Sequence, residues 1–279
     1  MPIILSLTKS ENVLWAAGPE GLYRLNGHGL EAVPQPEAEL ACCGSDGSRI
    51  LVGGRPHGAA FSLNAGGNWQ AAWMDGVEES VLCIAPDPRV AESGVLLAGS
   101  AGGGVLRSAN HGQSWSPCNF GLLDYTVLAL AWAPVAPAAA WPRWEVAFAG
   151  TEEGVYRSPN GGRGWRRSAG VEGIVQSLAV ATDFHENGVV LAGTENAGLW
   201  RSSDGGRNFA QVENGPQRVD ALTATPTGWL LSDESGLWYS ADSAQWQRLP
   251  ASKPALTLLS TEQGVWAGGE EGVMLVEQY

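Results

Sequence analysis

Acidic side chains recur in short glycine-bounded turns, where they could act together on a positively charged ligand. Convergent carboxylates raise the local negative potential, which favours a basic peptide or a cation. The alternative is that Gly-Thr-Glu-x-Gly is simply a solvated turn that binds nothing. The residues of this set are Glu20, Glu152, Glu153, Glu195, Asp233, Glu234, Glu270 and Glu271.

A second group of residues suggests an enzyme. Glu78 and Glu79 form another acidic pair, and Tyr125 follows Asp124. Two carboxylates that flank a sugar ring are the usual machinery of glycoside hydrolysis. The sequence has no nucleophilic Ser/His/Asp set, no phosphate-binding loop and no metal-hydrolase motif. We therefore expect a noncatalytic protein, and a glycosidase is the only enzyme class with support.

The cysteines and histidines show no ligand spacing. Cys42, Cys43, Cys83 and Cys118 contain no CxxC pair, and the four histidines are far apart. We expect buried free thiols, no disulfide, no metal site and no cofactor.

Composition narrows the partners. Of 279 residues, 44% are hydrophobic and 16% are charged, which excludes a disordered chain, and no apolar run is long enough to span a bilayer. The net charge of -13 repels phosphate backbones, so we expect no nucleic-acid partner and no membrane insertion. The start of the chain has no basic leader or cleavage site, which predicts a cytoplasmic protein, although a trimmed secretory precursor would look the same.

An internal repeat determines the expected fold. A unit that resembles Gly, an apolar residue, any residue, Arg and Ser occurs in seven copies at a mean spacing of about 42 residues. Within each copy the hydrophobic period is two, as in short strands joined by tight turns. Four strands in each of seven copies predict an all-β, seven-bladed propeller over residues 1–279, which we expect to be monomeric. The blade centres are expected near Leu22, Ala59, Val105, Val155, Leu199, Leu237 and Val273.

The last copy is incomplete. Its three strands are predicted at Ala255–Ser260, Gly264–Gly268 and Gly272–Tyr279, after which the sequence given ends. Met1–Ile3 is too short to supply a fourth strand. We therefore predict a three-stranded last blade that is closed by side-chain packing between blades.

A turn motif, S-x-[DN]-x-G-x-x-[WF], joins the predicted third and fourth strands of the blades. The Asx side chain bonds backbone amides, the glycine supplies a positive φ, and the ring shields the hairpin. We call these segments the box turns. Their residues are Ser62, Asn64, Gly66, Trp69; Ser108, Asn110, Gly112, Trp115; Ser158, Asn160, Gly162, Trp165; Ser202, Asp204, Gly206, Phe209; and, one residue shorter, Ser240, Asp242, Trp246.

The box turns resemble the Asp-box (BNR) repeat over almost the whole chain. The chain looks like an Asp-box β-propeller, a group that includes sialidases, sortilin-type receptors and photosystem II assembly factors. That resemblance implies a structural role for the box residues, away from any ligand. The repeated arginines Arg24, Arg107, Arg157 and Arg201 are expected to bridge neighbouring blades.

In a propeller, the loops between second and third strands share one face with the connections from each fourth strand to the next blade. We call this face the acidic mouth. Its expected binding residues are the eight carboxylates above together with Arg55, His57, Glu78, Glu79 and Tyr125.

A Pro/Ala-rich insertion interrupts blade four on the opposite face. It runs over Pro134–Trp144 and carries Trp141 and Trp144, which either expose apolar surface to a partner or fold back as a lid. The sequence thus predicts a scaffold that binds a protein partner at the acidic mouth or at this loop. The alternative is a carbohydrate-binding protein or a sialidase-like glycoside hydrolase.

Overall fold

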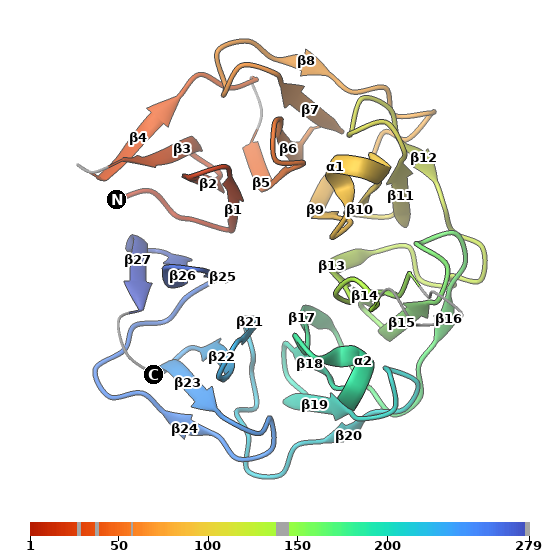
Figure 1. The fold of residues 1–279 in the computed structure, drawn as a ribbon, viewed down its shortest axis with the longest axis vertical. Coiled ribbons are helices and arrows are strands. Elements are labelled where there is room, and N and C mark those ends of the chain that lie inside the picture. Colours follow the sequence, from red (N-terminus) through yellow and green to blue (C-terminus); the bar gives the residue numbers. More distant parts are fainter. Residues whose placement is uncertain (27–28, 37–38, 57, 138–144, 277–279) are drawn as a thin grey trace.

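The computed structural model describes residues 1–26, 29–36, 39–56, 58–137 and 145–276. Seven antiparallel sheets stand around one axis like the blades of a propeller (Figure 1). In each sheet the strands are paired in sequence order from the axis outward. The prediction of a seven-bladed all-β propeller is therefore confirmed.

The strands of blades one to four, in order, are β1 (Ser6–Ser10), β2 (Val13–Gly18), β3 (Gly21–Asn26), β4 (Gly29–Val33); β5 (Glu39–Ser45), β6 (Ile50–Arg55), β7 (Ala59–Ser62), β8 (Gln70–Ala71); β9 (Val81–Pro86), β10 (Leu96–Ser100), β11 (Val105–Ser108), β12 (Ser116–Pro117); and β13 (Val127–Trp132), β14 (Ala147–Thr151), β15 (Gly154–Ser158), β16 (Arg166–Arg167).

The strands of blades five to seven are β17 (Val175–Val180), β18 (Val190–Thr194), β19 (Leu199–Ser202), β20 (Ala210–Gln211); β21 (Ala221–Thr225), β22 (Gly228–Asp233), β23 (Gly236–Ser240), β24 (Gln247–Arg248); and β25 (Thr257–Thr261), β26 (Gly264–Gly269), β27 (Gly272–Val276). All seven repeat markers fall in third strands. Two one-turn helices that the sequence did not predict, α1 (Val90–Ser93) and α2 (Phe184–Asn187), join first to second strands in blades three and five.

Period-two patterning builds a core between the blades. The first strand β17 alternates buried and half-buried residues, whereas every residue of the second strands β10, β14 and β18 is buried. A second strand is sandwiched between two neighbouring sheets, so both of its faces are apolar. At Gly150 a Cβ atom would lie only 2.7 Å from the backbone oxygen of Val175 in the next blade. Glycine there allows the first strand of one blade to approach the sheet before it.

The ring closes between blades seven and one. Blade seven has three strands, as predicted, and β1 contacts β25. Ile4 is fully buried and packs in a cluster with Leu259 and Trp266. Its backbone N–H also donates to the oxygen of Gly269 at 3.0 Å, so one main-chain hydrogen bond adds to the expected side-chain packing.

Candidate functional site

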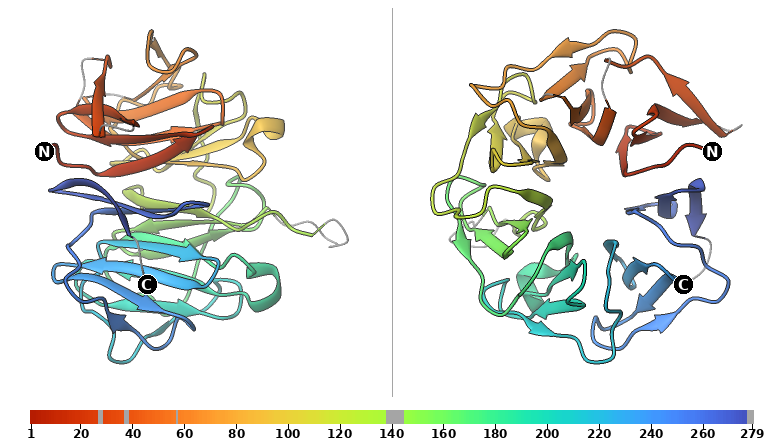
Figure 2. Two further views of the ribbon diagram at one scale, coloured as in Figure 1. Left: turned by 60° about the vertical axis from the view of Figure 1, so that its left-hand side comes forward. Right: turned by 180° about the vertical axis from the view of Figure 1, so that it is seen from behind.

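The turns between second and third strands carry the predicted carboxylates to one end of the blades, and the helices α1 and α2 project at the other end (Figure 2). Glu78 and Glu79 precede β9, and Tyr125 precedes β13, on connections that reach the same end as those turns. His57 lies outside the described residues. Exposed members of the set are Glu20, Arg55, Glu78, Glu79, Tyr125, Glu152, Glu153, Glu234, Glu270 and Glu271.

Some predicted mouth residues form hydrogen bonds or ion pairs within the protein. The Asp233 side chain is buried, and its Oδ1 accepts hydrogen bonds from the backbone N–H of Ser235 at 2.7 Å and of Gly236 at 3.1 Å. Glu20 accepts a hydrogen bond from the backbone N–H of Ile3 at 2.8 Å. Glu271 pairs with Lys253. These carboxylates have local structural tasks that their spacing in the sequence did not reveal.

Four exposed carboxylates of the mouth differ from these three. Glu152, Glu153, Glu234 and Glu270 form no ion pair with any residue in the described ranges. Arg167 approaches Glu153, but its Nη2 donates to the backbone oxygen of that residue at 2.5 Å. The mouth therefore presents exposed carboxylates that form no ion pair, with Arg218 close enough to Glu234 to feel its charge.

Arg218, Asp220 and Gln176 form a polar cluster at the mouth that the sequence analysis missed. Asp220 Oδ1 accepts from Arg218 Nε at 2.7 Å and from Gln176 Nε2 at 3.1 Å. The hydrogen bond and charge of Asp220 raise the pKa of Arg218, and the charges of Glu195 and Glu234 add to this effect. The one signal in the sequence was an Arg-x-Asp triplet directly before a first strand.

Below the mouth, the central channel has a mixed polar and apolar lining. A cavity of about 200 Å³ is lined by all seven first strands. Leucines face it from several blades, among them Leu128, Leu178 and Leu222, while Gln176 and Asp220 supply polar groups. The alternating leucines of the first strands were the available signal for this lining.

The residues that suggested a glycosidase are engaged in loop structure. Asp124 Oδ1 accepts from the backbone N–H of Thr126 at 3.0 Å, and Oδ2 accepts from that of Glu153 at 2.9 Å. Glu79 Oε2 accepts from the backbone N–H of Glu78 at 3.1 Å. Tyr125 is 46% exposed, and its backbone oxygen binds the N–H groups of Gly102 and Gly104. Both oxygens of Asp124 thus join two loops, which does not favour its use as a general acid.

The insertion of blade four lies between β13 and β14, as predicted. Trp141 and Trp144 lie outside the described residues. Of the described part, Val135 is exposed, and the backbone oxygen of Pro134 lies 2.7 Å from His185 Nε2 of α2.

The box turns form a repeated hydrogen-bond pattern. In blade five, Ser202 Oγ donates to Asp204 Oδ1 at 2.8 Å and accepts from the N–H of Gly206 at 3.0 Å. Asp204 is only slightly buried; burial raises its pKa, but hydrogen bonds led by those from Asn208 outweigh this and hold the pKa below its usual range. The same two serine contacts recur in the box turns of Asn64, Asn110 and Asn160, and in blade six Ser240 Oγ donates to Asp242 Oδ1 at 3.1 Å.

Three of the repeated arginines bridge to the box turn of the next blade. Arg107 Nε donates to the oxygen of Gly161 at 3.0 Å, and Arg157 Nε donates to that of Gly205 at 2.7 Å. Arg201 Nε donates to Ser243 Oγ at 2.7 Å. Arg24 differs from the expectation, because it pairs with Glu31 within its own blade.

We predict that Arg157→Ala lowers the free energy of unfolding by about 2 kcal/mol, because it removes a charged hydrogen bond between blades. Arg166→Ala is the matched control, since Arg166 is exposed on the adjacent strand, and it should change stability by less than about 0.5 kcal/mol. Urea titrations of the two variants measure the difference. Equal effects would show that the bridge does not stabilise the ring.

Burial changes the acidity of two of the thiols. Burial raises the pKa of Cys43 and of Cys83 to about 12, so neither is a thiolate at neutral pH. Within the described ranges, no three His, Cys, Asp or Glu residues are grouped to hold a metal ion. No helix in the same ranges is long and apolar enough to cross a membrane.

Comparisons in sequence give no relative: no family model matches the chain, and no curated protein does. Solved structures do match. The extracellular domain of BT4673 from B. thetaiotaomicron has a TM-score of 0.75 and 14% identity, and the match covers 98% of this chain and 38% of that one. An ancestral GH74 enzyme has a TM-score of 0.76 and 19% identity, and the match covers 96% of this chain and 43% of that one. YCF48 from Cyanidioschyzon merolae has a TM-score of 0.69 and 12% identity, and the match covers 97% of this chain and 94% of that one.

The chain therefore spans less than half the length of the first two proteins and most of the length of the third. At these identities the likeness concerns architecture alone. The chain is similar to seven-bladed β-propellers, including a glycoside hydrolase and a YCF48 protein.

Proposed function

We propose that this chain is a noncatalytic Asp-box propeller that acts as a platform and binds a basic segment of a protein partner at its acidic mouth. The observation that carries the proposal is the set of exposed carboxylates Glu152, Glu153, Glu234 and Glu270, which form no ion pair in the described part of the chain. A basic segment would supply the missing positive charge.

On the opposite face, two carboxylates contact cationic or imidazole side chains. Glu145 lies 2.9 Å from Arg89 Nη2 and 3.5 Å from Arg163 Nη1. Asp46 contacts Arg49 and His111. These contacts join different blades or brace a turn, so they serve the fold.

An octalysine peptide tests the charge requirement. We expect it to bind the wild-type chain at about 50 mM NaCl and to weaken strongly at about 300 mM, because salt screens exposed charges. The triple variant Glu152→Gln, Glu153→Gln, Glu234→Gln should bind about tenfold more weakly, since each exposed pair contributes up to ~1 kcal/mol. Calorimetric titration measures both effects.

The matched control removes the same number of charges from the other face. Glu11, Glu92 and Glu186 are exposed there, and replacing all three by glutamine changes the net charge equally. This control should bind the peptide nearly as well as the wild type. Equal loss in both triple variants, or no binding at low salt, would refute a binding site at the mouth.

A further inference from the structure

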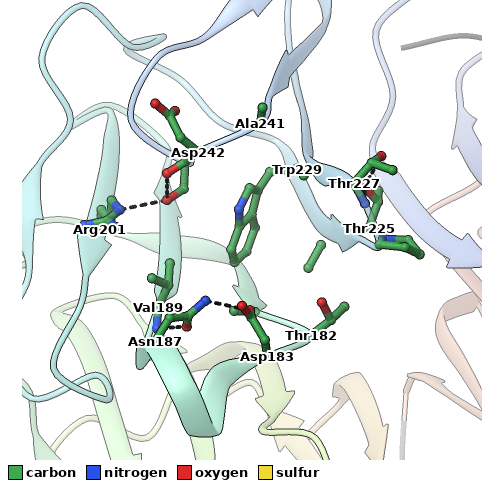
Figure 3. A pocket seen from close by; sticks show the side chains of 15 residues that line it. Thr182, Asp183, Asn187, Val189, Arg201, Thr225, Thr227, Trp229, Ala241 and Asp242 are labelled. Atoms are coloured by element: carbon green, nitrogen blue, oxygen red, sulfur yellow. Dashed lines mark hydrogen bonds between the residues drawn. The ribbon is translucent and has the colours of Figure 1, made fainter.

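A polar pocket lies between blades five and six (Figure 3). Its lining residues come from the end of the blades that carries α2, opposite the acidic mouth. Its volume is about 480 Å³, within the range of small-ligand sites. Four segments form its walls: the β17–β18 connection with α2, the β21–β22 turn, the box turn of blade six, and Arg201 of β19.

The pocket exists because blade six has short turns. Only Pro226 and Thr227 separate β21 from β22, whereas helices occupy the corresponding connections of blades three and five. At the previous interfaces side chains occupy this space: Arg89 pairs with Glu145, and Phe148 packs edge-on against Phe184 with ring centroids 6.0 Å apart. The short turn of blade six leaves the corresponding space open.

Trp229 stands in the middle of the pocket (Figure 3). Its side chain is 6% exposed, and its Nε1–H donates no hydrogen bond to a described residue. Trp115 and Trp165 donate to the backbone oxygens of Gly112 and Cys118, whereas the indole N–H groups of Trp15, Trp238 and Trp246 are buried without a described partner. The Nε1 of Trp229 is not enclosed as theirs are, so it can donate to a molecule in the pocket. Trp229 thus holds an unused donor at the pocket wall.

Charged side chains around the pocket also have hydrogen-bonding atoms that no described residue uses. Asp183 Oδ1 accepts from Asn187 Nδ2 at 2.6 Å, and Asp242 Oδ1 accepts from two backbone N–H groups. The Oδ2 atoms of both carboxylates accept no hydrogen bond from the described residues. Arg201 donates through Nε to Ser243, which leaves its two terminal nitrogens without a described partner.

We propose that this pocket binds a small neutral saccharide. Asp183 and Arg201 carry opposite charges, and the Asp242 carboxylate points away from Trp229 (Figure 3), so the space beside Trp229 has no net charge that would favour an ion. Each sugar hydroxyl both donates and accepts, so adjacent hydroxyls can use the free carboxylate oxygens and the free N–H groups together. The hydroxyls of Thr182 and Thr227 add further partners. This site is independent of the mouth and of any protein partner.

The test uses the full chain and a panel of glucose, galactose, mannose, N-acetylglucosamine, maltose and cellobiose. In two-dimensional ¹H–¹⁵N spectra, the indole signal that Trp229→Phe removes is assigned to Trp229. We expect at least one sugar to shift that signal saturably at millimolar concentration, a Kd typical of about -4 kcal/mol. The double variant Asp183→Asn, Thr227→Val should weaken this binding at least about tenfold.

Both substitutions are at exposed positions and keep the local shape, so the double variant should fold. Glu234→Gln, on the mouth face, is the control and should bind the sugar as the wild type does. If no sugar of the panel shifts the Trp229 signal, or if the double variant binds as tightly as the wild type, the pocket is not a saccharide site. A loss of sugar binding in Glu234→Gln alone would move the site to the mouth and overturn the proposal equally.

Discussion

Gly206→Ala is expected to lower the free energy of unfolding by roughly 3 kcal/mol. The glycine has a φ of 78°, and a Cβ atom placed on it would lie 2.1 Å from Cε1 of Phe148 in the preceding blade. The left-handed backbone adds about 1–2 kcal/mol for a residue with a Cβ atom. Overpacking against the fully buried Phe148 adds a further penalty of about 1–3 kcal/mol. Urea titration followed by tryptophan fluorescence measures the sum.

Gly76→Ala separates the two contributions. Gly76 has nearly the same φ, 77°, but nothing lies within 4 Å of its added Cβ atom. This control should therefore show only the backbone penalty of about 1 kcal/mol. Phe148→Leu should also make Gly206→Ala less harmful, because a smaller side chain faces the new methyl group. Equal effects of the two glycine substitutions would rule out the interblade contact as the reason for glycine in the box turn.

The repeat pattern was sufficient to predict the architecture because every blade is built from the same short strands and turns. Three features can be recognised in the sequence of a single copy: the alternation of apolar residues in strands, the glycine where the next blade approaches, and the box turn. Strand ends were predicted less accurately: the first strand of blade seven begins at Thr257 and not at Ala255. Helices α1 and α2 were missed because each is a single turn that carries no helical period.

The candidate sites were harder to predict because they depend on side-chain direction. Asp233 and Glu234 are adjacent in the sequence, yet one carboxylate is buried in its own turn and the other is exposed. The interblade pocket arises from a side chain that blade six lacks when compared with its neighbours. Such a space between two copies leaves no motif within either copy. Trp229 reads as a core residue in the sequence, and its unused donor is visible only in three dimensions.

Asp46→Asn is expected to be the most harmful substitution of an ionisable residue, and its effect should depend on pH. The Asp46 side chain is almost fully buried, and its Oδ1 accepts the backbone N–H of Arg49 at 2.6 Å and of Ser48 at 2.9 Å. Burial raises the pKa of Asp46, but these hydrogen bonds and that of the Arg49 side chain outweigh it and lower the pKa. The loss at neutral pH should be about 2–4 kcal/mol, because Arg49 keeps a charge without its partner.

The sign of the pH dependence follows from the lowered pKa. The folded chain binds the Asp46 proton less tightly than the unfolded chain, so the contribution is complete above the ordinary aspartate pKa of about 3.9 and declines as pH falls through the folded value. The wild type and Asp46→Asn should therefore differ most near pH 7 and converge in acid. Urea titrations between about pH 7 and pH 3 measure this convergence.

His111 must be separated from Asp46, because it joins the same contact from the box turn of blade three. Its Nδ1 lies 2.8 Å from Asp46 Oδ2 but forms no hydrogen bond with a described residue. His111 has a φ of 60°, which asparagine tolerates, so His111→Asn removes the imidazole with little backbone strain. If that variant reproduces the whole pH dependence, the imidazole and not the Asp46 turn is responsible. A stability difference for Asp46→Asn that stays constant from neutral to acid pH would show that the carboxylate charge does not stabilise this turn.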